Sequence, residues 1–328
     1  MKNEKSIFTS WVFVTIGALL CTALWGSATP FIKLGYRVMF EGGSPDVPST
    51  ILFAGIRFFF AGLLTVLIYS IARKKLLYPK LANMHKVGAV ALFQTVVQYF
   101  FFYVGLANTS GAKGTVISGS SSFFAILISA LLFRQEKLTV KKVVACIIGF
   151  LGIIAVNLNG LDFSMNLMGD AFVLFSAISL GVSSVLIKIF SGDEDPVVIS
   201  GYQFVMGGAV MVAVGLILGG KIDNIDLSAI AILIYLSALS AVAYALWGIL
   251  LKHNPVSRVT IFSFMTPVFG VLLTALILPD ESTVHPVNLL ISLVLVCLGV
   301  FLLNYVHNPK QNDEIAEPST PTEGDKEA

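Results

Sequence analysis

The chain contains ten apolar stretches, each of about 20 residues, that are separated by short polar links. In the hydrocarbon core of a bilayer, only helices and closed barrels can satisfy every backbone polar group. Hydrophobic residues make up 56 % of the 328 residues and charged residues 12 %, with a mean hydropathy of +0.87. We therefore predict an all-α integral membrane protein with spans at 11–33, 50–72, 87–106, 112–133, 143–156, 168–190, 199–218, 227–250, 260–278 and 287–305.

One stretch of the chain occurs twice. Residues 112–136 (AKGTVISGSSSFFAILISALLFRQE) align without a gap on residues 257–281 (SRVTIFSFMTPVFGVLLTALILPDE), an offset of 281 − 136 = 145 residues. Both copies have a base near the start, hydroxyls in the first half and Glu at the end. At the same offset, Tyr99 falls on Tyr244. The sequence therefore predicts an internal duplication, in which each half supplies an equivalent wall of one site.

The duplication extends beyond this stretch. Lys33 of GSATPFIK falls on Lys188 of GVSSVLIK, and Arg57 falls on Gln203. The last residues of the chain have no apolar periodicity and are acidic, which is typical of disorder. We predict a first repeat over 1–158, a second repeat over 159–306 and a disordered acidic cytoplasmic tail over 307–328.

The distribution of Lys and Arg predicts the orientation in the membrane. With the N-terminus inside, sixteen of these residues lie on cytoplasmic segments, and only Arg37, Lys113 and Lys221 lie outside. Because five spans per repeat is an odd number, the second repeat is inserted in the opposite sense to the first. The prediction is ten transmembrane helices as two inverted five-helix repeats, N-in/C-in, with the solute site near the midplane between them.

Several motifs resemble the EamA family of the drug/metabolite transporter superfamily. They are WGSATPFIK in the first span, AGIRFFFAG in the second, and TPVFGVLLTALIL followed by Glu281 in the ninth. The resemblance covers about residues 11–306 and implies a ten-helix carrier, typically a bacterial exporter of amino acids or other small metabolites, with a cavity lined by the first, third and fourth helices of each repeat. The family's usual Pro in the fourth span is Ser122 here, whereas the ninth span keeps Pro267.

Polar and aromatic side chains in the middle of spans are the candidates for the site, because polar groups in a bilayer are costly unless they face a cavity or a partner. The third span carries an amide and tyrosine face, the fourth and ninth carry hydroxyl stripes, and the first and eighth carry aromatic residues away from the interface. Packing between helices would explain each residue alone. The predicted substrate-binding residues are Trp25, Thr29, Arg57, Gln94, Gln98, Tyr99, Tyr103, Ser118, Ser121, Tyr244, Trp247, Ser263 and Thr266. The predicted bend or gating residues are Pro30, Gly119 and Pro267.

Some charged residues have two interpretations from sequence. Lys33 and Arg57 could bind a substrate carboxylate or phosphate, or Lys33 could reach the interface while Arg57 caps carbonyls at a helix end. Glu136 and Glu281, where spans 4 and 9 leave the membrane, could form gate salt bridges or lie at solvated helix ends; the sequence favours solvated ends.

Absent residue types narrow the function further. No Asp or Glu lies deep in a span, so the carboxylate that exchanges protons for cationic drugs is missing, and all four His lie in links or at span ends. No catalytic residue set, metal site or cofactor motif is found, so we expect neither an enzyme nor a cofactor.

These observations predict a secondary transporter of a small neutral or zwitterionic, amino acid-like metabolite, exporting it across the bacterial cytoplasmic membrane by alternating access. Its expected partners are the small-molecule substrate and the lipid bilayer, without nucleic acid, as a monomer or weak dimer. The alternatives are a carrier of a larger anionic solute such as a nucleotide sugar, bound by Lys33, Arg57 and Lys188, or a non-transporting membrane enzyme or lipid-handling scaffold.

Overall fold

The computed structural model describes residues 7–158, 166–281 and 285–305. The predicted tail over 307–328 and the boundary between the predicted repeats at 158/159 lie outside or at the edge of these residues. Within the described part every regular element is a helix, and ten helices are long and apolar enough to cross a membrane. The predicted class, an all-α protein with ten membrane-spanning helices, is therefore confirmed.

Seven spans are single helices, and three are built from shorter segments. The single helices are α2 Trp11–Met39, α3 Val47–Ala72, α8 Val140–Asn157, α9 Leu167–Phe190, α10 Pro196–Ile217, α11 Leu227–His253 and α14 Pro286–Tyr305. The composite spans are α4 Met84–Val90 with η3 Ala91–Val97 and α5 Gln98–Leu106; α6 Gly111–Gly119 with α7 Ser121–Leu127 and η4 Ile128–Leu132; and α12 Val256–Thr260 with η6 Ile261–Phe264 and α13 Met265–Ile277. The links hold the short 3₁₀ turns η1 Glu41–Gly43, η2 Leu81–Asn83 and η7 Pro279–Glu281.

The first span is longer than predicted, because α2 continues past Lys33 to Met39. Pro30 lies inside this helix and does not end it. A proline removes one backbone hydrogen bond but leaves the rest of the helix intact when packing supports it. The helix ends at Met39, and the next residue, Phe40, has an extended backbone.

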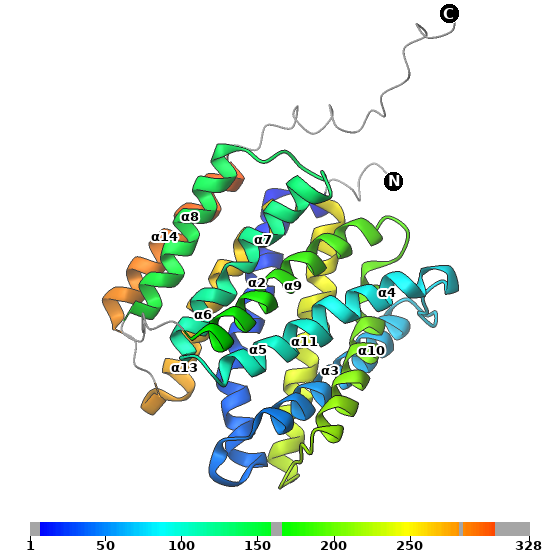
Figure 1. Cartoon of the computed structure of the whole chain (residues 1–328). Coiled ribbons are helices and arrows are strands. Elements are labelled where there is room, and N and C mark those ends of the chain that lie inside the picture. Colours follow the sequence, from blue (N-terminus) through cyan, green and yellow to red (C-terminus); the bar gives the residue numbers. More distant parts are fainter. Residues whose placement is uncertain (1–6, 159–165, 282–284, 306–328) are drawn as a thin grey trace, which may run out of the picture.

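The helix packing pairs equivalent spans of the two halves, residues 7–158 and 166–305. The second spans of both halves, α3 and α10, lie side by side at one edge of the bundle, and the fifth spans, α8 and α14, at the opposite edge (Figure 1). The other pairs are reciprocal: α2 packs on α11 and α13, while α9 packs on α5, α6 and α7. A two-fold relation between the halves would produce this pattern.

Two glycines make the reciprocal contacts possible. A Cβ on Gly26 of α2 would lie 2.6 Å from Cβ of Phe269, and one on Gly181 of α9 would lie 3.0 Å from Cβ of Phe124. These are equivalent positions, since the sequence repeat places Gly26 on Gly181 and Phe124 on Phe269. The first span of each half therefore approaches the fourth span of the other closely enough to require glycine.

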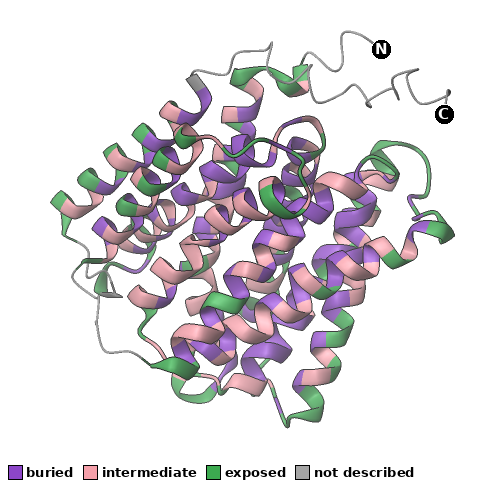
Figure 2. Ribbon diagram, turned by 45° about the horizontal axis from the view of Figure 1, so that its top comes forward, coloured by how far each residue is buried: buried purple, intermediate pink, exposed green. Residues whose placement is uncertain are grey.

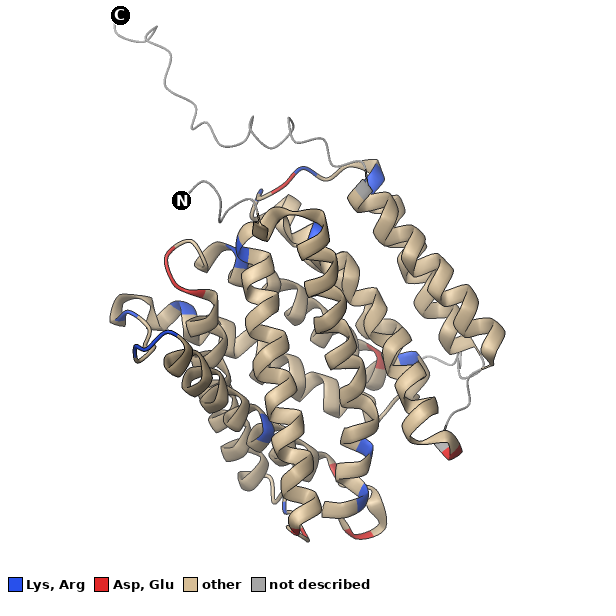
Figure 3. Ribbon diagram, turned by 180° about the vertical axis from the view of Figure 1, so that it is seen from behind, with Lys and Arg blue, Asp and Glu red and all other residues tan. Residues whose placement is uncertain are grey.

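Burial and charge follow the bilayer. Buried residues line the contacts between helices, and exposed residues lie on the periphery and in the links (Figure 2). Charged residues gather at the two ends of the bundle and leave most of the helices' length without charge (Figure 3). This pattern fits a hydrocarbon-facing perimeter.

Candidate functional site

The helices that position the candidate site depart from regular α-helix near the middle of their spans. In the third span, η3 is a π-helix that contains Gln94 and leads directly into Gln98 and Tyr99 of α5. In the fourth span, α6 ends at Gly119 and α7 begins at Ser121. Irregular turns of this kind free backbone groups and are tolerated at membrane depth where they face protein or a cavity.

The ninth span is interrupted at the equivalent level, by the 3₁₀ turn η6 before Met265. Pro267 is the third residue of α13, where its missing N–H costs little. A Cβ on Gly119 would lie 2.3 Å from Cδ1 of Ile153, so a larger residue at this interruption of the fourth span would require the Ile153 side chain to move. The predicted bend residues Gly119 and Pro267 thus lie at the two interruptions, and Pro30 lies inside unbroken α2.

Five of the predicted residues form a cluster that we call the aromatic centre: Trp25, Tyr99, Tyr103, Tyr244 and Trp247. The ring of Trp25 lies 4.9 Å from the ring of Tyr244 and 4.9 Å from that of Trp247. The hydroxyls of Tyr99 and Tyr244 hydrogen-bond each other at 3.0 Å. Because these two tyrosines are equivalent in the repeat, the two halves meet at the aromatic centre through matching residues.

Arg57 lies beside the aromatic centre, and its position corrects one interpretation from the sequence. It lies ten residues into α3, only 4 % exposed, so it does not cap carbonyls at a helix end. Its Cζ lies 4.3 Å from the centroid of the Phe58 ring. Its own carbonyl accepts a 3.0 Å hydrogen bond from the Ser237 hydroxyl of α11.

The hydroxyl stripes of the fourth and ninth spans meet at the interruptions. The Ser122 hydroxyl donates to the carbonyl oxygen of Thr260 at 2.9 Å and hydrogen-bonds the Ser263 hydroxyl. Ser118 lies one turn before Ser122 in the fourth span, and Thr266 lies about one turn after Ser263 in the ninth. Neither the Ser118 Oγ nor the Thr266 Oγ1 has a hydrogen-bond partner, although both atoms are buried.

The remaining predicted residues are less closely associated. Gln94 and Gln98 are both buried, and Oε1 of Gln98 has no hydrogen-bond partner. Ser121 is buried at the start of α7. Thr29 is exposed on α2, with its Oγ1 3.4 Å from where a Cβ of Gly270 would lie.

Glu136 is not at a solvated helix end, and the sequence interpretation that favoured this was wrong. The residue is 8 % exposed. Its carboxylate accepts hydrogen bonds from Nζ of Lys142 at 2.6 Å and from the backbone N–H of Ser257 at 3.0 Å, and from the Ser257 hydroxyl as well. It therefore joins the end of the fourth span to the start of the ninth. The side chain of Glu281 lies outside the described residues.

Two features of the site escaped the sequence interpretation. Thr95, in the π-helix, donates from its hydroxyl to Oε1 of Gln203 at 2.7 Å, and the ring of Tyr36 of α2 lies 5.5 Å from that of Phe53, one turn before Arg57 in α3. Thr95 had a signal, since it lies next to Gln94 on the amide face of the third span. Tyr36 had none, because its span was expected to end at Lys33.

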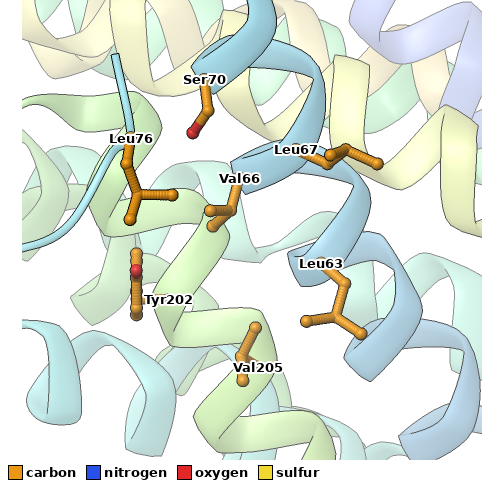
Figure 4. A pocket seen from close by; sticks show the side chains of 7 residues that line it. All are labelled: Leu63, Val66, Leu67, Ser70, Leu76, Tyr202 and Val205. Atoms are coloured by element: carbon orange, nitrogen blue, oxygen red, sulfur yellow. The ribbon is translucent and has the colours of Figure 1, made fainter.

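A surface hollow of about 240 Å³ lies between α3 and α10 and is separate from the aromatic centre (Figure 4). Its lining is apolar except for Ser70 and Tyr202. Both hydroxyls already bond Leu77: Ser70 Oγ accepts from its N–H at 3.0 Å, and Tyr202 donates to its carbonyl at 3.0 Å. With its polar groups satisfied, this hollow suits a lipid chain better than a polar solute.

The described residues contain no group of three or more His, Cys, Asp or Glu side chains that could hold a metal ion. Lys188, proposed from sequence as one phosphate partner of an anionic solute, donates to the carbonyl oxygens of Lys252 and Asn254 at 3.1 and 2.9 Å. It therefore satisfies a helix end and is separate from the aromatic centre.

Comparison with known proteins gives consistent matches over most of the chain. The model of the EamA-like transporter family matches residues 12–158 and again 167–305. An uncharacterized transporter of Archaeoglobus fulgidus is 25 % identical over 287 residues, covering 87 % of this chain and 96 % of the relative. A protein of Escherichia coli named a probable amino-acid metabolite efflux pump is 27 % identical over 282 residues, covering 81 % of this chain and 87 % of the relative.

A solved crystal structure is also similar, with a TM-score of 0.74 at 18 % identity, covering 94 % of this chain and all of the other. At this identity the likeness concerns the fold alone.

Proposed function

Because the chain belongs to the EamA-like transporter family, we propose that it exports a small neutral or zwitterionic metabolite, with amino acids as the leading class. The name of the Escherichia coli relative supports this class. The proposed location is the bacterial cytoplasmic membrane, with both chain termini inside, as the Lys and Arg distribution predicts.

Unpartnered polar atoms carry the proposal. Twelve buried side-chain N or O atoms of the described residues have no hydrogen-bond partner, and five belong to the predicted substrate-binding residues: Trp25, Arg57, Gln98, Ser118 and Thr266. A buried polar group without a partner costs about 1–3 kcal/mol. The indole N–H donates, the amide oxygen accepts and the hydroxyls do both, so together they can bind a solute that carries donors and acceptors.

The interruptions at Gly119 and before Met265 support alternating access, since they lie in the fourth and ninth spans next to the Ser122–Ser263 contact. The buried carboxylates of Glu136 and Glu194 lie at helix ends and are hydrogen-bonded there. Without a carboxylate in the centre, the proposed transport is facilitated diffusion or solute exchange rather than strict proton antiport.

Counterflow into proteoliposomes tests the proposal. Vesicles loaded with one unlabelled amino acid should take up the same labelled amino acid, and Gln98→Ala or Thr266→Val should slow uptake by about twofold to tenfold. Ser292→Ala is the matched control, because its Oγ is also buried and unpartnered but lies in α14. No uptake of any amino acid by the parent protein would contradict the proposal, and strong driving by an imposed pH gradient would contradict the exchange mechanism.

A further inference from the structure

Arg57 is a buried cation for which the described residues offer no carboxylate. The side chain is 4 % exposed, and the ion pairs formed by the described part of the chain all involve other bases. An unpaired charge inside a membrane protein is expensive, and such residues typically face a partner, a cavity or a ligand. The counter-charge of Arg57 must therefore come from somewhere other than these residues.

The surroundings of Arg57 are aromatic and phenolic. The guanidinium lies over the Phe58 ring, with Cζ 4.3 Å from its centroid, and the ring of Tyr99 packs against the same Phe58 ring at 4.5 Å between centroids. Tyr103 and Tyr244 extend this phenolic cluster: the Tyr103 ring lies 5.9 Å from that of Tyr99, and the Tyr244 hydroxyl hydrogen-bonds the Tyr99 hydroxyl at 3.0 Å. Rings and phenols stabilise a cation without neutralising it, and Nε of Arg57 remains unpartnered.

The equivalent position in the second half shows that the fold does not need a cation here. Gln203, which the repeat places on Arg57, is completely buried on α10 and accepts a 2.7 Å hydrogen bond from Thr95. A neutral amide thus fills the equivalent place in the second half, where it bonds the third span of the first half. The charge of Arg57 is therefore present in one half alone, beside the aromatic centre where the two halves meet.

We propose that Arg57 binds the carboxylate of the transported solute, so that the substrate class is small molecules with a free carboxylate, amino acids among them. This inference rests on the proposed transport function and specifies which end of the solute is recognised. The planar guanidinium matches a carboxylate in a paired hydrogen-bond geometry, and the phenol of Tyr99 adds a donor. The ring of Tyr244 lies 4.9 Å from that of Trp25, so a solute bound to Arg57 would have its remaining groups next to the indole side chains of the aromatic centre.

The thermal stability of the purified protein tests this assignment. Each standard amino acid is compared with its carboxamide, which keeps the side chain and the amine but lacks the negative charge. Amino acids that bind should raise Tm, and their amides should bind at least about tenfold more weakly. In Arg57→Gln, which gives the first half the amide that the second half has at Gln203, the shift by amino acids should disappear, while the Tm of the ligand-free protein should stay equal or rise.

Arg258→Gln is the matched control, because Arg258 is the other buried arginine and donates to oxygens of Thr9 and Asn254. It should lower Tm without removing the shift by amino acids. A fall in Tm in Arg57→Gln as large as in Arg258→Gln would assign Arg57 a structural role and overturn the proposal. Amides that bind the parent protein as well as the acids would overturn it too, while leaving transport itself standing. Failure of the transport proposal has another signature, the absence of counterflow for every amino acid.

Discussion

Buried charged residues have different kinds of partner at one end of the bundle and at its centre. At the end where the fourth span finishes, Glu136 has three hydrogen-bond donors, and Nη1 of Arg258 donates to the Thr9 carbonyl and to Oδ1 of Asn254, both at 3.1 Å. At the centre, the guanidinium of Arg57 lies over the aromatic ring of Phe58, against which Tyr99 packs. Both arginines leave Nε unpartnered, so the difference lies in the oxygens that the other nitrogens reach.

The comparison indicates that the contacts that stabilise the fold and the groups available for binding lie in different parts of the molecule. Bonds at the end join the halves: Glu136 of the first half holds Ser257 of the second, and Asn254 of the second half donates to the Phe8 carbonyl of the first at 3.0 Å. They hold the two halves together at this end, and under the proposed alternating access they would have to break for this end to open. Several polar atoms at the centre lack hydrogen-bond partners, which lowers stability and leaves donors and acceptors that a ligand can bind.

Glu136→Ala should give the largest loss of stability. It leaves the Ser257 N–H and the ammonium of Lys142 without their acceptor, so we expect a loss of about 2–4 kcal/mol in the free energy of unfolding. Thermal melting in detergent measures it. Glu136→Gln keeps one acceptor oxygen and should lose less. A Tm unchanged in Glu136→Ala would mean that this end does not depend on its buried charge.

Arg258→Gln should come second, at about 1–3 kcal/mol, because it removes two charge-assisted hydrogen bonds at the same end. The double variant Glu136→Ala/Arg258→Gln sharpens the point, since both residues fix the first turn of α12. If the end acts as one unit, the double variant should lose less stability than the sum of the losses in the two single variants. Strict additivity would show two independent contacts.

Removing the central hydroxyls should cost little stability. Tyr99→Phe and Tyr244→Phe each break the same 3.0 Å hydrogen bond, so each should cost about 0.5–1.5 kcal/mol and the double variant no more than the larger of the two. Binding should respond more strongly in Tyr99→Phe, because Tyr99 packs against the same Phe58 ring as Arg57. Equal effects of both variants on amino-acid binding would argue against a solute held between Arg57 and Tyr99.

The sequence predicted the membrane helices well. In a bilayer, an apolar stretch outside a β-barrel can satisfy its backbone hydrogen bonds only as a helix. From the offset of the repeat, it also predicted that Tyr99 and Tyr244 occupy equivalent positions in the two halves. Their direct hydrogen bond required knowing that the third and eighth spans approach each other at that level.

Other features depend on tertiary packing and left no local signal. The π-helix at η3, ALFQTVV, contains neither Gly nor Pro. The burial of Glu136 depends on which helix end lies opposite it, and Ser257 is 121 residues away in the chain. The hydroxyl stripe around Ser122 could be read from sequence, but its contact with Ser263 across the halves could not.

The smallest expected effect concerns a charge at the rim, outside the membrane-spanning segments. Asp193 follows α9, pairs with Lys86 and is largely exposed. The hydrogen bond from Lys86 holds the pKa of the Asp193 carboxyl below its usual value. A carboxyl whose pKa is lower in the folded state contributes stability above its unfolded pKa, about 3.9, and loses that contribution as the pH falls through the folded pKa.

The parent protein and Asp193→Asn should therefore differ in how Tm depends on pH. At pH 7 their difference should be small, because an exposed ion pair contributes little and is screened by salt. Below about pH 4 the parent should lose this contribution and the two melting curves should converge. Lys86→Gln should behave like Asp193→Asn if the pair is the cause. A difference in Tm that grows on acidification would have the wrong sign for a carboxylate stabilised by Lys86. Asp193 would then resemble Arg57, whose charge is incompletely partnered, rather than Glu136, whose charge is fully hydrogen-bonded.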